Sequence, residues 1–311
     1  MSHTIHAEFE AWMSKYGRTY ANKAEKNKRF KIFKENFEYI HNFNNERNKT
    51  YKLSINKYSD LTHDEFVAAR TGDKNPGKAP TSSPFTYAGF KDVPTSLDWR
   101  KKGAVTPIKN QGNCQSCWAF AAVAATEGIT QIKTGNLISL SEQQLVDCSR
   151  SGNNGCSPGS KTDAFKYIIG NNGLTTEDNY PYTGIQGTCD HEKQESVVAN
   201  ISDYGSVPAN KEKELLKAVS NQPVTVSIEA SGVDFRHYQS GLFNGYCGTN
   251  HDHAVTVVGF GTSEEYGIDY WLVKNSWGLD WGENGYIRMQ RNVDAEEGLC
   301  GIAMLPVYPI A

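Results

Sequence analysis

The segment from Asn110 to Phe120 contains the residue of this chain that is best placed to act as a nucleophile. It reads Asn-Gln-Gly-Asn-Cys-Gln-Ser-Cys-Trp-Ala-Phe, a glycine-containing loop followed by an alanine-rich apolar stretch. That stretch predicts a buried helix with Cys117 in its first turn. The partial positive charge of a helix N-terminus lowers the pKa of a thiol, especially beside an imidazolium. We therefore predict a thiolate nucleophile at Cys117.

A thiolate that cleaves an amide needs an acid–base partner and a group that orients this partner. His253 opens the predicted strand 254–260, and Asn275 closes the predicted strand 270–274. Both residues therefore stand at strand ends, which are rigid mounts. We expect the Asn275 amide to hold the His253 imidazole and Trp277 to shield their hydrogen bond from water.

The developing oxyanion also needs hydrogen-bond donors. Gln111 lies six residues before Cys117, and we expect its side-chain N–H to point at the oxyanion beside the Cys117 backbone N–H. A different chemistry is open at this stage, because Cys114 and Cys117 form a Cys-x-x-Cys pair. That spacing alone is a weak signal, and it also fits a redox pair or half of a zinc site.

The number and placement of the cysteines indicate the redox environment. All seven lie in the last two thirds of the chain: Cys114, Cys117, Cys148, Cys156, Cys189, Cys247 and Cys300. An odd number spread over a large domain fits three disulfides and one free thiol, which favours an oxidising compartment. We expect the secretory pathway, with vacuole, lysosome and extracellular space as destinations. The triplets at Asn48 and Asn200 are candidate glycosylation sites on that route.

Composition and charge exclude several classes of function. No apolar run approaches the roughly 18 residues of a membrane span, and the N-terminus lacks the features of a signal peptide, so we expect no membrane partner. Residues 1–92 carry 16 Lys and Arg against 11 Asp and Glu, whereas residues 93–311 carry 16 against 24. The acidic larger part argues against a nucleic-acid partner. A basic segment joined to an acidic body suggests an intramolecular mask.

The first 92 residues predict helices followed by a linker. Helical spacing of apolar residues covers 7–16, a longer helix covers 23–45, and a short one covers 63–69, while 51–60 alternates like a strand. Residues 71–92 are rich in Pro, Gly and Ser and predict an extended connector that a protease can cut before Val93. One face of the longer helix mixes charged and apolar residues: Glu25, Arg29, Phe33, Asn36, Ile40 and Asn44.

The remaining residues predict two subdomains and an α+β fold. About 102–205 is helix-rich, and about 206–305 is strand-rich. The helix from Cys117 should end at Gly135, a capping-box pattern at Ser141 opens a second helix, and 163–169 is a third. The strands are expected at 224–228, 254–260, 270–274 and 285–289.

The chain from Gln111 to Phe120 resembles the nucleophile motif of papain-like cysteine proteases. The resemblance continues through Asp252-His253-Ala254-Val255 and Lys274-Asn275-Ser276-Trp277-Gly278, in the family's order and separation. The mixed face of the longer N-terminal helix looks like the inhibitory prosegment of the cathepsin L-like and plant branch. Asn56-x-Tyr58-x-Asp60 is similar to that branch's second prosegment motif, with Ser54 and Tyr58 as departures.

This resemblance implies a papain-like fold with a helical subdomain, a β-barrel-like subdomain and an active-site cleft between them. A helical prosegment (1–70) would precede a linker (71–92) that runs through the cleft opposite to a substrate, and 93–311 would be the mature enzyme. The disulfides implied are Cys114–Cys156, Cys148–Cys189 and Cys247–Cys300, which leaves Cys117 free. No cofactor or metal is implied. The expected partners are polypeptide substrates, the prosegment itself and cystatin-type inhibitors, and the enzyme is expected to be a monomer.

The resemblance also implies the residues that bind substrate: Gly159, Ser160, Lys161, Ser227, His251, Asp252, Ala254, Trp277 and Leu305. Around the second residue before the scissile bond this lining is more polar than the apolar one usual in the family. One hypothesis is that Lys161 and His251 act as counter-charges for polar or acidic side chains. The alternative is that Lys161 points to solvent and Leu305 keeps the pocket apolar.

Three functions compete on this sequence. The first is a cysteine endopeptidase made as an autoinhibited zymogen and activated by removal of residues up to about 92, at acidic pH. The second is a non-catalytic relative that keeps the fold for storage or binding. The third is an inhibitor acting through residues 1–92, which is here joined to its own target. The presence of Cys117, His253 and Gln111 together favours the endopeptidase.

Overall fold

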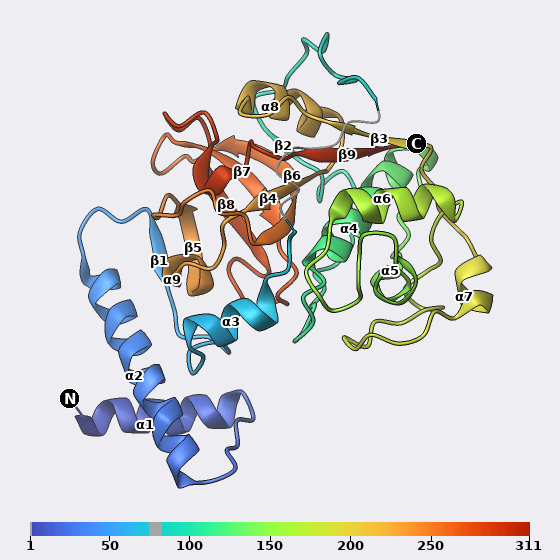
Figure 1. The fold of residues 1–311 in the computed structure, drawn as a ribbon. Helices are drawn as coiled ribbons and strands as arrows, with labels where there is room; N and C mark the ends of the chain where they lie inside the picture. The colour runs from blue at the N-terminus through green and yellow to red at the C-terminus, as the bar shows by residue number, and fades with distance from the viewer. Residues whose placement is uncertain (1, 75–82) are drawn as a thin grey trace.

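The computed structural model describes residues 2–74 and 83–311, and its elements form three parts (Figure 1). The first part, the N-terminal unit (residues 2–70), contains α1 (Ser2–Lys15), α2 (Lys23–Asn45), β1 (Tyr51–Leu53) and α3 (His63–Arg70). The second part is a helical half with α4 (Cys117–Thr134), α5 (Glu142–Cys148), α6 (Lys161–Gly170) and α7 (His191–Glu195). The third part is a sheet half with β2 (Leu97–Asp98), β3 (Asp203–Ser206), α8 (Glu212–Asn221), β4 (Val224–Ile228), α9 (Val233–Arg236), β5 (Tyr238–Phe243), β6 (His253–Thr262), β7 (Asp269–Lys274), β8 (Tyr286–Gln290), a 3₁₀ turn (Leu299–Gly301) and β9 (Val307–Ile310).

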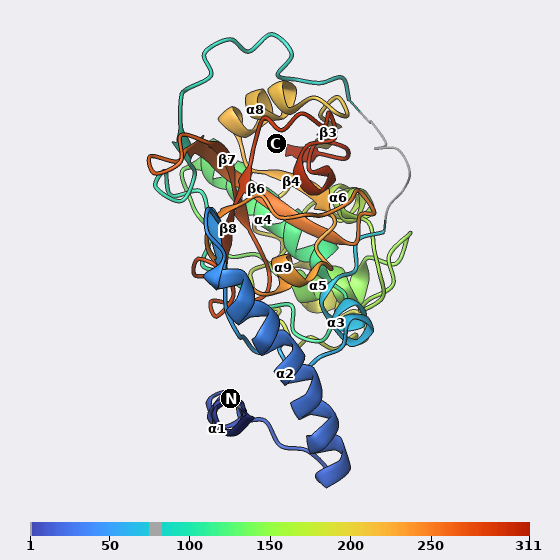
Figure 2. The same cartoon turned by 90° about the vertical axis from the view of Figure 1, so that its left-hand side faces the viewer.

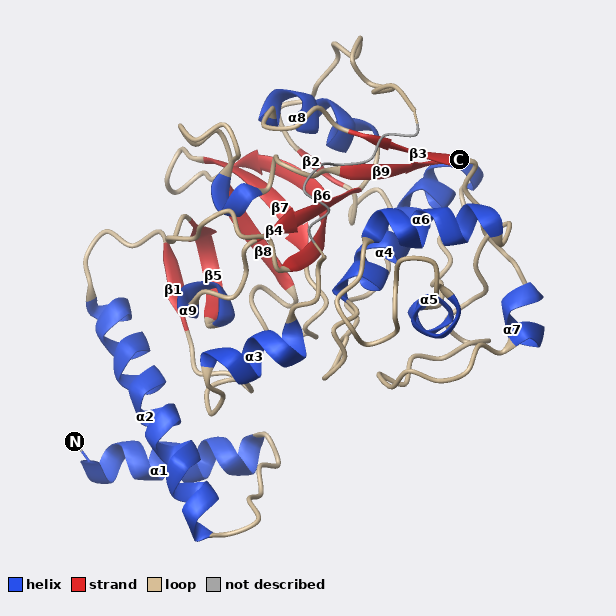
Figure 3. Cartoon of the chain, in the orientation of Figure 1, coloured by secondary structure: helices blue, strands red, loops and turns tan. Residues whose placement is uncertain are grey.

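The strands form one open sheet in the order β1-β5-β8-β7-β6-β4-β9-β3, with β2 paired to β6. Figure 3 shows these strands gathered beside the helical half. In the described residues β1 and β3 stand at opposite ends of the order, so the sheet does not close. The expectation of a β-barrel-like subdomain is therefore wrong in this respect. Strand β1, which comes from the N-terminal unit, pairs with β5 and so forms one end of the sheet.

Helix α4 is the element on which the two halves meet. Its residues are buried on nearly every side, which its alanine-rich sequence allows, and it packs on β6 as well as on α5 and α6. Gly128 lets a loop of the sheet half approach closely, because a Cβ there would lie 2.5 Å from Cγ of Pro223. Within residues 2–74 and 83–311, none of the helices is both long enough and apolar enough to cross a bilayer.

The expected elements of the main body agree closely with the structure. Helix α4 ends at Thr134, and Gly135 adopts the left-handed conformation (φ 80°) that a glycine C-cap allows. The hydroxyl of Ser141 accepts a hydrogen bond from the N–H of Gln144, which caps α5 as the capping-box spacing suggests. The expected strand-rich part starts slightly late and ends slightly early, because β3 begins at Asp203 and β9 extends to Ile310.

The N-terminal unit has its own aromatic core where α1 crosses α2 (Figure 2). Phe9 and Trp12 of α1 each pack against Phe33 of α2, with ring centroids 5.2 Å apart in both pairs. Helix α2 has the predicted bounds, 23–45. The strand expected at 51–60 is shorter, because the Asn56 side chain accepts a hydrogen bond from the N–H of Tyr58 and so stabilises a turn instead.

The mixed face of α2 holds the rest of the N-terminal unit in place. The Arg29 guanidinium makes two hydrogen bonds to the Glu65 carboxylate, at 2.6 and 3.0 Å, and one of 2.6 Å to Glu25. Asn36 donates to the carbonyl of Ser59, and Asn44 bonds both backbone groups of Leu53. Among the other motif residues, Phe33 and Ile40 are buried, and the Asp60 carboxylate accepts a hydrogen bond from Tyr20.

Tyr58 and Phe66 attach the N-terminal unit to the sheet half. Their rings pack edge-on against Trp277, with centroids 6.0 and 5.2 Å away, and Arg236 lies over the ring of Phe66. The backbone carbonyl of Arg236 also accepts a hydrogen bond from Asn56. Because aromatic contacts and backbone pairing both contribute, residues 51–70 are held much more firmly than the outlying α1–α2 crossing.

We predict that Arg29→Gln lowers the stability of the N-terminal unit by about 1 kcal/mol at near-neutral pH. The effect is this small because a partly exposed charged hydrogen bond contributes only modestly to stability. The Arg29 hydrogen bonds lower the pKa of Glu65 from 4.5 to about 2. This stabilisation is complete above about pH 4.5 and is lost as the pH falls towards about 2. The stability of the N-terminal unit in the variant should therefore no longer depend on pH in this range. Hydrogen exchange of the α2 amides in the intact chain measures both effects.

Lys28→Gln is the matched control for this prediction. It removes a neighbouring positive charge that is more exposed and lies 3.8 Å from the same carboxylate. Equal loss of α2 protection in the two variants at every pH would contradict a specific role for Arg29.

Candidate active site

Cys117 is the first residue of α4 and the one cysteine outside the disulfides. The disulfides are Cys114–Cys156, Cys148–Cys189 and Cys247–Cys300, the pairs that the resemblance implies. Because Cys114 is bonded to Cys156, Cys114 and Cys117 do not form a redox pair, and Cys114 offers no thiolate to a metal. The Cys117 side chain is fully buried at the positive end of the α4 dipole.

His253 and Asn275 form the hydrogen-bonded pair that the sequence predicts. His253 is the first residue of β6, Asn275 directly follows β7, and His253 Nε2 lies 2.8 Å from Asn275 Oδ1. The Trp277 ring stacks on this pair, with its centroid 4.7 Å from that of the imidazole. Asn275 Oδ1 also accepts a hydrogen bond from the Ser276 N–H, which fixes the amide orientation.

The thiol meets this pair through the backbone of β6. The N–H of Ala254 donates to Cys117 Sγ at 3.4 Å, so the sulfur contacts the residue directly after His253. A second contact between α4 and β6, from the Thr256 hydroxyl to the carbonyl of Ala121, keeps the helix and the strand in register. Cys117 and His253 therefore lie on opposite halves, at the place where these halves meet.

Gln111 is buried and held at both ends of its amide. Its Oε1 accepts a hydrogen bond of 2.7 Å from the Ser276 hydroxyl, and its Nε2 donates to the carbonyl of Cys114. An amide nitrogen carries two hydrogens, so a second N–H remains for an oxyanion. Ser276 was not identified as a site residue from the sequence, although its place directly after Asn275 is a usable signal.

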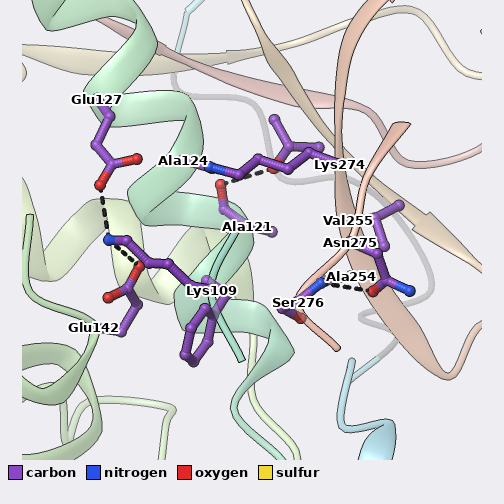
Figure 4. A pocket seen from close by; sticks show the side chains of 12 residues that line it. Lys109, Ala121, Ala124, Glu127, Glu142, Ala254, Val255, Lys274, Asn275 and Ser276 are labelled. Carbon is purple, nitrogen blue, oxygen red and sulfur yellow. Dashed lines mark hydrogen bonds and ion pairs between the residues drawn. The ribbon is translucent and has the colours of Figure 1, made fainter. Parts of the chain in front are cut away.

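A chain of buried charges behind the catalytic residues was also missed by the sequence analysis. Figure 4 shows a pocket between α4 and the strands in which Lys109 binds Glu127 and Glu142, at 2.9 and 2.7 Å. Glu127 also accepts a hydrogen bond from Thr106, which in turn is bound by Lys274. Burial raises the pKa of Glu142. Because Lys274 precedes Asn275, this chain braces the strand end that carries the amide.

Residues 70–74, the crossing segment, run over the thiol and pair with both halves. The N–H groups of Gly72 and Asp73 donate to the carbonyl of Asp252, at 2.8 and 3.0 Å. On the other side, Gly159 N–H donates to the Gly72 carbonyl, and Lys74 N–H donates to the Gly159 carbonyl, at 2.9 and 2.8 Å. The Asp73–Gly159 bridge is parallel.

Of the expected linker 71–92, the described residues up to Lys74 cross the site. Residues 75–82 lie outside the described residues. Beyond them the chain runs against other elements: Thr86 N–H donates to the Tyr308 hydroxyl of β9, and Lys217 of α8 donates to the Ala88 carbonyl. Residues 83–92 thus lie over α8 and β9, away from Cys117.

Gly72 is required at its position by both space and conformation. Its φ is +138°, and a Cβ there would lie 2.3 Å from the backbone oxygen of Gln115 in the loop before Cys117. Gly159 is restricted by space, because a Cβ would lie 2.6 Å from Nε1 of Trp118. These two glycines let the crossing segment and the helical half approach to hydrogen-bonding distance.

The structure brings together four of the residues implied to bind substrate. Gly159, Lys161 and Asp252 contact Asp73, and Ser227 contacts Lys161. Asp73 itself was not predicted as a site residue. The other five take varied places. Ser160 uses its hydroxyl to cap α6, His251 bonds the Gly301 carbonyl, Ala254 contacts Cys117, Trp277 stacks on His253, and Leu305 is buried just before β9.

The covered site holds Cys117 and His253 uncharged. Burial, and after it the negative charge of Asp73, raises the pKa of the Cys117 thiol. Burial lowers the pKa of His253 to about 4, against the opposing effects of the Asn275 hydrogen bond and the Asp73 charge. At near-neutral pH the pair is therefore a neutral thiol and a neutral imidazole.

Comparison with known proteins places this geometry in a family. Residues 93–310 match the profile described as "Papain family cysteine protease", and residues 9–66 match "Cathepsin propeptide inhibitor domain (I29)". Vignain of Phaseolus vulgaris is 50% identical over 97% of this chain and 84% of its own length. The senescence-specific cysteine protease SAG12 of Arabidopsis thaliana is 51% identical over 96% of this chain and 88% of its own.

A solved structure of a related proform has the same arrangement throughout. The crystal structure of the Amb a 11 cysteine protease, a major ragweed pollen allergen, in its proform superposes with a TM-score of 0.92 at 42% identity. The superposition covers 100% of this chain and 95% of that one, so it includes the N-terminal unit as well as both halves. The chain therefore belongs to the papain family of cysteine proteases, in the form of a zymogen that carries its own inhibitory propeptide.

Proposed function

We propose that this protein is a cysteine endopeptidase in which Cys117 is the nucleophile, His253 the general acid and base, and Asn275 the group that orients His253. The observation that supports this most strongly is the buried free thiol at the start of α4, in contact with β6 beside the His253–Asn275 pair. The second N–H of Gln111 and the N–H of Cys117 would stabilise the oxyanion. The substrates are polypeptides.

The reaction proceeds in two stages. The Cys117 thiolate attacks the scissile carbonyl carbon, and the carbonyl oxygen becomes an oxyanion that accepts hydrogen bonds from Gln111 and the Cys117 N–H. His253 then gives its proton to the departing amine as the C–N bond breaks, which leaves a thioester at Cys117. In the second stage neutral His253 takes a proton from water, and the hydroxide produced cleaves the thioester and regenerates the thiolate.

Autoinhibition follows from what the crossing segment covers. While it is in place, the backbone groups of Asp252 and Gly159 are engaged by the propeptide and the thiol is excluded from water. Its removal hydrates the site, so the two causes that raise the pKa of Cys117, burial and the Asp73 charge, both disappear. A thiolate–imidazolium pair at the positive end of α4 can then form.

Acidic activation has a physical basis in His253. The lowered pKa means that the covered state binds fewer protons at this residue than the open state does. The covered state therefore loses stability as pH falls from about 6.5 to about 4, and it is not affected above that window. The groups that act on the imidazole are Asn275, which accepts its hydrogen bond, Asp73, whose charge favours protonation, and the Trp277 ring.

Several finer assignments belong to the same proposal. The mature enzyme would be residues 93–311, with processing near Val93, and it would act as a monomer that cystatin-type inhibitors bind. Three disulfides support an oxidising compartment on the secretory pathway, with vacuole, lysosome or extracellular space as the destination. Asn48 and Asn200 are both exposed, as acceptors of glycosylation must be.

Alkylation tests the proposal against a non-catalytic relative. Iodoacetamide should label a single thiol, Cys117, slowly in the zymogen because the sulfur is buried, and rapidly after acid processing. Labelling of the processed protein should abolish hydrolysis of gelatin. Hydrolysis that continues after complete labelling of Cys117 would contradict its role as the nucleophile.

Substitution of Gly72 tests the covering role of the crossing segment. Gly72→Ala places a Cβ against the Gln115 backbone, so we expect it to weaken the closed state by about 1–3 kcal/mol and to let the intact zymogen react faster with iodoacetamide. Gly89→Ala is the matched control, because a Cβ at Gly89 meets no atom within 4 Å. Equal labelling rates in the two variants and the unmodified zymogen would show that residues 70–74 do not control access to the thiol.

A further inference from the structure

Lys161 does not point to solvent. It is the first residue of α6 and is only 3% exposed in the zymogen, where Asp73 of the propeptide lies against it. Its ammonium donates a hydrogen bond to the hydroxyl of Ser227 on β4, so the side chain reaches across from the helical half to the sheet half. It therefore lies between the two halves, beside the crossing segment.

The partner of this ammonium is an acidic side chain from the propeptide. Asp73 Oδ2 lies 3.6 Å from Lys161 Nζ, and both side chains are almost completely removed from water. Neither oxygen of the Asp73 carboxylate has a hydrogen bond to any other described residue. Among those residues, Asp73 is also the one carboxylate within 4.0 Å of Lys161 Nζ. Three residues act around Asp73 through their charge or hydrogen bonding: Lys161, Ser227 and His251. We call these three residues the Lys161 site.

The register of the crossing segment shows which residue of a bound chain enters this site. The N–H and the carbonyl of Gly159 form hydrogen bonds with Gly72 and Lys74, the residues on either side of Asp73. A substrate strand that pairs with the same two groups would place one residue opposite Gly159, and its side chain would lie where that of Asp73 lies now. By the resemblance stated above, this is the second residue before the scissile bond.

The Lys161 site is left with unmatched positive charge when the propeptide leaves. A cation in the first turn of a helix is unfavourable with respect to the helix dipole, so Lys161 does not stabilise α6 by its position. The nearby carboxylates are already engaged: Asp252 accepts hydrogen bonds from the N–H groups of Ala230 and Ser231, and Glu229 accepts from two others. An ammonium in such a place needs an anion from the ligand.

His251 adds a second unused group to the site. Its Nε2 bonds the Gly301 carbonyl at 3.0 Å, while its Nδ1 is buried with no hydrogen-bond partner among the described residues. Burial lowers the pKa of this imidazole. The negative charge of Asp73 raises the pKa and the positive charge of Lys161 lowers it. Because Nε2 donates to the Gly301 carbonyl, Nδ1 can donate to a carboxylate only when the imidazole is protonated, so His251 adds a partner for an acidic side chain only at low pH.

We propose that the Lys161 site is a specificity subsite for acidic side chains, so that the enzyme prefers polypeptides with Glu or Asp as the second residue before the scissile bond. This proposal rests on the endopeptidase function proposed above. In the zymogen, Asp73 fills the subsite in place of a substrate residue. The propeptide would thus inhibit by placing in the subsite the kind of side chain that the enzyme selects. It does so on a backbone that runs in the opposite direction to that of a substrate.

The test uses the processed enzyme and three fluorogenic peptides that differ only at that residue, which is Glu, Gln or Leu. At near-neutral pH, where a glutamate is ionised, kcat/KM for Glu should exceed that for the isosteric Gln by about 10-fold or more, with Leu below Glu. Lys161→Met should reverse the order and favour Leu. Lys166→Met is the matched control, because Lys166 is an exposed cation on the same helix that binds only Asp163 among the described residues, and it should keep the order of the unmodified enzyme.

The outcomes separate the two proposals. A preference of the unmodified enzyme for Leu with Glu rejected, or the same order in Lys161→Met as in Lys166→Met, would overturn the acidic subsite while leaving the endopeptidase intact. Efficient cleavage of the Leu peptide by Lys161→Met would show that this variant is folded. Failure of the unmodified enzyme to cleave any of the peptides, together with no alkylation-sensitive hydrolysis of gelatin, would instead contradict the endopeptidase function.

Discussion

The interaction on which the rest of this structure depends is the backbone pairing of residues 70–74 with both halves at once. Asp252 accepts two N–H groups on one side, and Gly159 exchanges two hydrogen bonds on the other. Four hydrogen bonds of this kind would be modest on an exposed surface. Here they cover a site in which burial raises the pKa of the Cys117 thiol and lowers that of the His253 imidazole, so both groups are uncharged at near-neutral pH.

The elements that carry Cys117 and His253 are held by the main body itself. Cys117 belongs to α4 and His253 to β6, and among the described residues neither element takes a hydrogen bond from the propeptide. The buried chain from Glu142 through Lys109, Glu127 and Thr106 to Lys274 holds the strand end that carries Asn275. None of these contacts involves the propeptide, whereas Trp277, which packs against His253, also donates to the Arg70 carbonyl of the propeptide.

Sequence reasoning was most successful where a residue type alone determines a local structure. The bounds of α2, the glycine at which α4 ends and the His253–Asn275 pair could be predicted because spacing, capping and strand-end placement are local properties. The open sheet could not be predicted from the sequence, because the pairing of β1 with β5 joins segments about 190 residues apart. The strand expected at 51–60 failed because one side chain, that of Asn56, stabilises a competing turn.

The burial of Lys161 shows the same limit at the site itself. A lysine at the start of a helix is usually exposed, and the sequence left both a solvent-facing and a pocket-facing position open. In the zymogen the side chain faces the pocket, where it contacts Ser227 and Asp73 from other parts of the chain. Asp73 was missed because nothing in its local sequence distinguishes it from other acidic residues of a linker.

The central claim is that the crossing segment keeps the catalytic pair uncharged, and the most direct measurement is an NMR titration of the His253 imidazole. It is made in Cys117→Ala protein, which cannot process itself, before and after removal of the propeptide by added active enzyme, with assignment from the His253→Gln spectrum. The account predicts a pKa of about 4 in the intact zymogen and a return towards the ordinary value of 6.5 after removal. The same pKa in both forms would contradict it.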